Sequence, residues 1–191
     1  MSWKEAAEMS KQFVQKELYN ENDQPFDSCS DCKNKLEGDY KIFKSYSRLT
    51  KNEKHKLIFG VALCSQCLET YTSEISKSTT SKLESLGETY PDFGVTSIDI
   101  SFLRGMDDNQ VHRCAISNKT INELNEYQMS AICYNDKQIT PISILGDEGL
   151  KEYQDCISDE TQGYIDDFVN RIIDLPPEIE VLLKDDHFVL I

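Results

Sequence analysis

Cys29-Ser30-Asp31-Cys32 and Cys64-Ser65-Gln66-Cys67 are the two stretches that decide the fold of the first half of this chain. Each is a C-x-x-C pair, and 31 residues lie between them. Two sulfurs in one tight turn can bind a single metal at about 2.3 Å, and the intervening chain is long enough for a β-hairpin that brings the pairs together. The spacing predicts one structural Zn²⁺ with four ligands: Cys29, Cys32, Cys64 and Cys67.

Length and composition indicate what kind of protein surrounds this site. The chain has 191 residues, of which 39% are hydrophobic and 28% charged, so it can bury a hydrophobic core of its own. Zinc is therefore expected to stabilise one part of the fold and not the whole of it. The N-terminus lacks the apolar segment of a signal peptide, and no run reaches 18 apolar residues. Seven cysteines, an odd number, favour reduced thiols over a disulfide framework. We expect a cytoplasmic protein that does not enter a membrane.

Regular elements are expected on both sides of the two cysteine pairs. Apolar residues at three- and four-residue steps predict an N-terminal helix from Ser2 to about Tyr19, and a turn-rich run ends it at Pro25. Residues 40–46 and 57–63 carry the aromatic and β-branched residues of two strands. An amphipathic helix is expected from Cys67 to Leu86.

The order of knuckle, hairpin, knuckle and helix resembles the treble-clef and zinc-ribbon type of Cys₄ zinc-binding proteins. The resemblance covers about residues 26–86 and rests on the four cysteines and the order of the elements. It implies that the second cysteine pair lies in the first turn of a helix. A rubredoxin-like knuckle usually has Gly directly after its second Cys, whereas Lys33 and Leu68 stand here, which argues against iron.

The second half is expected to be a mixed unit without metal. Turn residues from Gly87 to Val95 mark the boundary. Alternation from Ile98 to Phe102 predicts a strand, residues 138–145 look extended, and Ser158 is the expected N-cap of a helix that ends at Leu175 before two prolines. A short helix (178–183) and a terminal strand (188–191) follow. The fold class is α+β in three segments: 1–25 (N-terminal helix), 26–95 (zinc unit) and 96–191 (acidic α+β unit).

An internal repeat links the two halves. A shift of 82 residues aligns Leu68, Tyr71, Ile75, Ser76 and Thr79 with Leu150, Tyr153, Ile157, Ser158 and Thr161, which makes five of 13 positions identical. The same shift places Gly146 and Gly149 on the second cysteine pair, and a shift of 85 places Cys114 and Ser117 on the first. The second copy, residues 111–168, should therefore bind no metal. The alternative is that two amphipathic helices align by their periodicity alone.

Charge suggests how the protein acts. Residues 1–96 hold 13 Lys and Arg against 15 Asp and Glu, a net of −2, whereas residues 97–191 hold 7 against 19, a net of −12. An acidic surface of this kind repels nucleic acid and favours a basic partner. We expect a non-enzymatic, zinc-stabilised protein that binds a protein partner through its acidic second half, as an inhibitor or immunity-type adaptor does.

Two alternatives remain open at this point. The 40–56 hairpin interleaves aromatic residues with six cations and resembles a nucleic-acid-binding zinc ribbon; the cations are Lys41, Lys44, Arg48, Lys51, Lys54 and Lys56. His112 and Cys114 could pair as base and nucleophile of an enzyme, although no third orienting group is recognisable. His55 between the knuckles could contact the metal, but Lys54 and Lys56 flank it, and a solvated hairpin histidine is the better explanation.

Overall fold

The computed structural model describes residues 2–10, 13–48, 50–90, 93 and 112–173. Within these residues the protein is a mixed α/β fold with five α-helices and one antiparallel sheet of five strands. This confirms the predicted combination of helices and strands. The predicted elements 98–102, 178–183 and 188–191 lie outside the described residues.

A long β-hairpin occupies the space between the cysteine pairs. β1 (Asp39–Ser47) pairs with β2 (Lys56–Cys64) from Tyr40↔Cys64 to Ser47↔Lys56, with a bulge after Ser45. Both strands agree with the prediction to within one residue at each end. The hairpin therefore carries Cys64 to the end of the sheet that lies beside the first cysteine pair.

The centre of the sheet joins strands from the two halves of the chain. The strand order is β2-β1-β3-β4, and β5 also pairs with β3. β3 (Glu126–Tyr134) pairs antiparallel with β1 along its whole length. The extended segment predicted at 138–145 is divided into β4 (Lys137–Gln138) and β5 (Ser143–Gly146). The boundary between 26–95 and 96–191 remains a prediction, and strands of both segments share one sheet.

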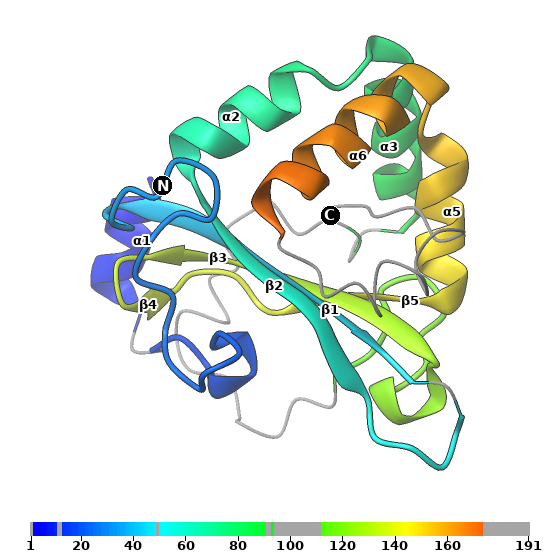
Figure 1. Ribbon diagram of the computed structural model, residues 1–191, viewed down its shortest axis with the longest axis horizontal. Helices are drawn as coiled ribbons and strands as arrows, with labels where there is room; N and C mark the ends of the chain where they lie inside the picture. Colours follow the sequence, from blue (N-terminus) through cyan, green and yellow to red (C-terminus); the bar gives the residue numbers. More distant parts are fainter. Residues whose placement is uncertain (1, 11–12, 49, 91–92, 94–111, 174–191) are drawn as a thin grey trace.

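Four helices form a layer on one side of this sheet (Figure 1). They are α2 (Ser65–Ser73), α3 (Lys77–Thr89), α5 (Asp147–Cys156) and α6 (Asp159–Ile172). The prediction of a single helix from Cys67 to Leu86 is wrong, because the structure has two helices, α2 and α3, over these residues. They are separate because the Ser76 side chain accepts the Thr79 N–H and starts a new helix. Ser158 caps α6 in the same way, as predicted.

Helices from one half of the chain pack against helices from the other half. The Tyr71 ring on α2 packs against the Phe168 ring on α6, with centroids 4.9 Å apart. In the other half, Leu83 on α3 joins the apolar cluster around Tyr153 on α5. Each half therefore receives its second covering helix from the opposite half. The main core includes buried residues of β1, β2, β3, α2 and α6.

The N-terminal helix is shorter than predicted. α1 covers Trp3–Met9, with Ser2 and Glu5 forming a capping box, and a 3₁₀ turn, η1, covers Lys16–Leu18. The helix stops because tertiary pairing takes over: the buried Ser10 hydroxyl donates to the Gln138 carbonyl, and the Val14 N–H donates to the Asp136 carbonyl. The predicted helix to Tyr19 is therefore wrong beyond Met9.

Candidate metal centre

The first cysteine pair lies in a tight loop that enters the sheet. The Cys29 N–H donates to the Asn34 carbonyl at 2.8 Å, and the Lys33 N–H donates to the Cys29 carbonyl at 3.0 Å. Lys33 has φ 62°, the left-handed conformation that glycine adopts most easily. Lys33 thus adopts the conformation that the glycine usual at this position would adopt. The Ser30 N–H fastens it to the Ala62 carbonyl of β2 at 2.8 Å.

The second pair lies at the junction of a strand and a helix. Cys64 is the last residue of β2 and the N-cap of α2, and Cys67 lies in the first turn of that helix. Free N–H groups and the helix dipole make this end of a helix favourable for thiolates. Strand pairing and helix start therefore fix the two sulfurs independently of any metal.

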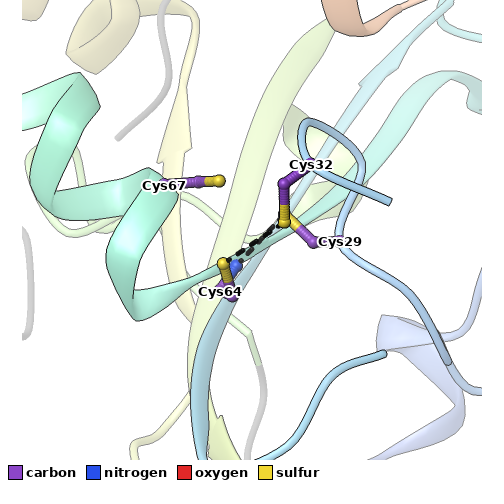
Figure 2. A group of neighbouring side chains, drawn as sticks. All are labelled: Cys29, Cys32, Cys64 and Cys67. Carbon is purple, nitrogen blue, oxygen red and sulfur yellow. Dashed lines mark hydrogen bonds between the residues drawn. The ribbon is translucent and has the colours of Figure 1, made fainter. Parts of the chain in front are cut away.

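The four sulfurs converge (Figure 2). The Sγ atoms of Cys29, Cys32, Cys64 and Cys67 all lie within 4.8 Å of one another, and those of Cys32 and Cys64 are 3.8 Å apart. Tetrahedral zinc with bonds of about 2.3 Å holds its sulfurs about 3.8 Å apart. The four cysteines are therefore close enough to hold one metal ion, and a soft S₄ donor set suits zinc.

Local hydrogen bonds prepare the first thiol for metal. Burial by itself raises the pKa of Cys29, but the N–H groups of Cys64, Cys32 and Asp31 lower it to about 7. The Cys64 N–H lies 3.5 Å from the Cys29 sulfur. Burial and the neighbouring thiols raise the pKa of Cys67. A cation shared by the four sulfurs would stabilise the thiolate form of both.

Exposure differs between the ligand positions. Cys29 is fully buried, Cys67 is 9% exposed, Cys64 is half-buried and Cys32 is exposed. Four cysteines around one ion leave no coordination position for a substrate, so the arrangement suits a structural site.

No known protein family, curated protein or solved structure matches this chain. Within the described residues, no helix combines the length and the apolar character needed to cross a membrane.

The histidines lie apart from the four sulfurs. His55 Nε2 is 3.0 Å from the Leu124 carbonyl oxygen, and its ring packs edge-on against Tyr127 with centroids 5.0 Å apart. These contacts account for His55 without a metal. Among the described residues no hydrogen bond joins His112 to Cys114, whose sulfur is buried and accepts the Gly146 N–H at 3.3 Å. The geometry offers no support for a nucleophile and base at these positions.

Half of the cations in the 40–56 hairpin contact other groups of the protein. Lys44 is buried and donates to the carbonyls of Glu17 and Tyr19 at 2.8 and 2.6 Å. Burial lowers the pKa of Lys41 to about 8, and its ammonium lies 5.0 Å from the centre of the Phe43 ring. Arg48 donates to the carbonyls of Lys51 and Asn122. The exposed cations that remain are Lys51, Lys54 and Lys56.

In the second half, apolar side chains crowd the positions that correspond to the second cysteine pair. A Cβ atom on Gly146 would lie 2.5 Å from both Leu124 methyl carbons. A Cβ atom on Gly149 would lie 2.5 Å from Leu145 Cδ1 and 3.5 Å from the Cys114 sulfur. Real Cβ atoms do not approach so closely, so the glycines are required by packing.

This crowding predicts opposite effects for two glycines. We expect Gly149→Ala to lower the free energy of unfolding by about 1–3 kcal/mol, because the added methyl group displaces Leu145 from a packed core. Gly163→Ala, in the exposed middle of α6 with nothing within 4 Å, should raise it by about 0.5–1 kcal/mol. Urea denaturation of both variants measures the difference. Equal effects would contradict the packing described here.

Proposed function

We propose that this is a non-enzymatic protein, stabilised by one structural Zn²⁺, that binds a basic protein partner through its acidic second half. The observation that carries the metal part is the convergence of four cysteine sulfurs from two separate turns. Zinc bound there would fasten the loop at Cys29 to the start of α2 and so fix one end of the hairpin. Cys29, Cys32, Cys64 and Cys67 would be its ligands.

The zinc unit is proposed to be of the treble-clef type. Support comes from the order of loop, hairpin and helix, with Cys64 at the N-cap and Cys67 in the first turn of α2. In this arrangement the metal has a mechanical role: it holds the hairpin and the helix in a fixed relation. Such a rigid scaffold suits the presentation of a surface to a partner.

The proposed binding surface is the outward side of α5 and α6. Acidic residues outnumber basic ones there, and the exposed acids are Glu148, Asp155, Asp159, Glu160 and Asp167. Of these, Glu148 is paired with Lys119 at 2.7 Å. Asp147 is engaged within the fold, since it accepts the N–H groups of Asn125 and Glu126. A surface of one sign accelerates encounter with a surface of the opposite sign and selects the partner.

Charge reversal on this surface tests the proposal. We expect Asp155→Lys with Asp167→Lys to slow association with the partner several-fold, and the wild-type rate to fall as salt is raised, because screening weakens steering. Both residues are exposed and lie outside the capping turn of α6. The partner would be captured from the cells of origin with the full chain, identified by mass spectrometry, and its association rate measured by surface plasmon resonance.

The hairpin supplies the matched control. Lys51→Glu, Lys54→Glu and Lys56→Glu reverse exposed charges without touching the buried Lys44 or the half-buried Lys41, so we expect the fold to be preserved. These changes should leave partner binding unaffected. If they abolish binding while Asp155→Lys and Asp167→Lys do not, or if the captured material is RNA or DNA, the nucleic-acid alternative replaces the proposal.

A further inference from the structure

We infer that residues 113–161 are a second copy of the unit formed by residues 28–79, that the chain is a fused and intertwined dimer of this unit, and that an apolar plug centred on Leu124 has replaced the metal in the second copy. The inference goes beyond the proposed function. It rests on hydrogen bonds and strand registers that recur at corresponding positions, which periodicity of apolar residues cannot produce.

The two knuckle loops have the same backbone bonding, at an offset of 85 residues. The Cys114 N–H donates to the Lys119 carbonyl at 2.8 Å, and the Asn118 N–H donates to the Cys114 carbonyl at 2.9 Å, as at Cys29. Asn118 has φ 56°, which matches Lys33. Isolated bridges close both loops, Ser28↔Lys35 and Arg113↔Thr120. The loop geometry has survived the loss of three ligands.

The junction with the second cysteine pair also recurs, at an offset of 82. The Gly146 N–H donates to the Cys114 sulfur at 3.3 Å, as the Cys64 N–H does to the Cys29 sulfur at 3.5 Å. The Ala115 N–H donates to the Ile144 carbonyl at 2.8 Å, the same distance as the corresponding bond from Ser30 to Ala62. An N–H···S bond of this kind would support a metal-bound thiolate in the first unit, and it is also present in the second.

The strands place an approximate twofold axis in the middle of the sheet. Tyr40 pairs with Cys64 and Tyr127 pairs with Gly146, so β1 corresponds to β3 at an offset of 87. Phe43 therefore corresponds to Ser130, and these two residues face each other in the β1–β3 ladder. In a twofold pair of antiparallel strands, the residue at the axis faces its own equivalent.

A second group of residues lies on the same axis, where the helices α3 and α6 begin. The Ser76 N–H donates to Thr161 Oγ1, and the Ser158 N–H donates to Thr79 Oγ1, both at 3.0 Å. The hydroxyls of Ser76 and Ser158 are 2.9 Å apart, and those of Thr79 and Thr161 are 3.2 Å apart. Contacts in which i meets j′ and j meets i′ are the signature of a twofold interface.

The crossing of the helices shows how two such units were joined. α6, which continues the second unit, covers α2 of the first, and α3, which continues the first unit, packs beside α5 of the second, so each unit is completed by the helix that continues the other. An exchange of equivalent elements is the arrangement of a domain-swapped dimer. A single ancestral unit would therefore have folded as a homodimer with two metal sites.

A small insertion explains why one of those sites is lost. The offset changes from 85 in the loop to 87 in the strand, so the second copy has two additional residues between Thr120 and Glu126. They allow the 3₁₀ turn η2 (Ile121–Glu123), after which Leu124 is 1% exposed and blocks any side chain at position 146. Packing of Leu124 and Leu145 takes the place of the metal.

The inference is tested by restoring the lost site in the full chain. The variant Ser117→Cys, Leu124→Ala, Leu145→Ala, Gly146→Cys, Gly149→Cys supplies three thiols beside Cys114 and removes both leucines that block the new side chains. The matched control is Leu124→Ala, Leu145→Ala, Gly146→Ser, Gly149→Ser, which has side chains of the same shape without the sulfurs. We expect the restored variant to bind one more Zn²⁺ per chain than its control. When Co²⁺ replaces Zn²⁺, the absorption typical of tetrahedral cobalt with thiolate ligands should rise in proportion to the additional metal.

The outcomes separate this inference from the proposed zinc site. One additional metal in the restored variant supports the second copy even if the wild type binds none, whereas a folded variant with no additional metal overturns it. If the variants do not fold, an experimental structure of the wild type decides: residues 28–79 and 113–161 should superpose by a rotation close to a half-turn, with the offsets given above. Failure to superpose would also overturn the inference.

Discussion

Cys67→Ser should abolish binding of the proposed zinc ion and lower the free energy of unfolding by at least about 3 kcal/mol. A structural zinc site contributes its binding free energy to folding, and three thiolates with a hydroxyl hold zinc far less tightly than four thiolates. The hydrophobic core, which spans both halves, should keep the variant folded at low temperature. Elemental analysis measures the metal, and urea denaturation measures the stability.

Cys114→Ser is the matched control for this experiment. Cys114 is 2% exposed and lies at the corresponding place in the second half, so its change tests the effect of losing a buried sulfur without a metal. Metal content should stay at that of the wild type. Absence of zinc from both the native and the zinc-reconstituted wild type would refute the metal centre itself.

The loss of metal should also have a spatial pattern. Hydrogen exchange should rise in the loop at Cys29, in the first turn of α2 and at the end of α6, where Arg171 contacts Asp31 at 3.3 Å. α3 should change less, because it packs beside α5, which carries none of the four clustered cysteines. From the sequence alone, hydrogen exchange is expected to rise throughout residues 26–86. The exchange rate of α3 therefore distinguishes that expectation from the one based on the tertiary packing.

Phe168→Ala should lower the free energy of unfolding by about 3–5 kcal/mol, the cost of removing a large buried aromatic side chain. Phe168 is 1% exposed and its ring lies 4.9 Å from that of Tyr71, so it joins α6 of the second half to α2 of the first. Metal content should not change, because α6 supplies no cysteine. Calorimetry and elemental analysis on the same sample measure both quantities.

Tyr164→Ala provides the comparison on the same helix. Its ring also contacts Tyr71, with centroids 5.8 Å apart, but Tyr164 is only half-buried. We expect a clearly smaller loss than for Phe168→Ala. Equal losses, or a loss below about 1 kcal/mol for Phe168→Ala, would show that the helices do not depend on this contact across the two halves.

The sequence by itself determined the features that depend on local chemistry. Two C-x-x-C pairs predicted a cluster of four cysteines, and their sulfurs do lie together. Aromatic and β-branched runs predicted β1 and β2, because strand preference is strong in a long hairpin. Ser158 was recognisable as a helix cap because capping involves only a residue and its next three neighbours. Zinc itself, the partner and the boundary between segments remain predictions.

Tertiary structure alone decided the features that depend on distant contacts. β3 was missed because buried residues occupy both of its faces, so the polar alternation of a surface strand is absent. The N-terminal helix ends early because pairing with residues 136–138 outweighs its periodicity. Lys44, exposed in any local view of the hairpin, is buried because the segment at Glu17 and Tyr19 covers it and accepts hydrogen bonds from its ammonium group through two backbone carbonyls.

The inferred repeat likewise combines features that can be predicted from neighbouring residues with features that depend on distant contacts. Local identities revealed the offsets 82 and 85, but the offset of 87 in the strands became visible only from pairing, since few side chains are conserved between β1 and β3. The exchange of α3 and α6 has no local signal at all. Which helix covers which half is settled by burial of Tyr71, Phe168 and Tyr153 against partners from the other half, and burial is a property of the assembled chain.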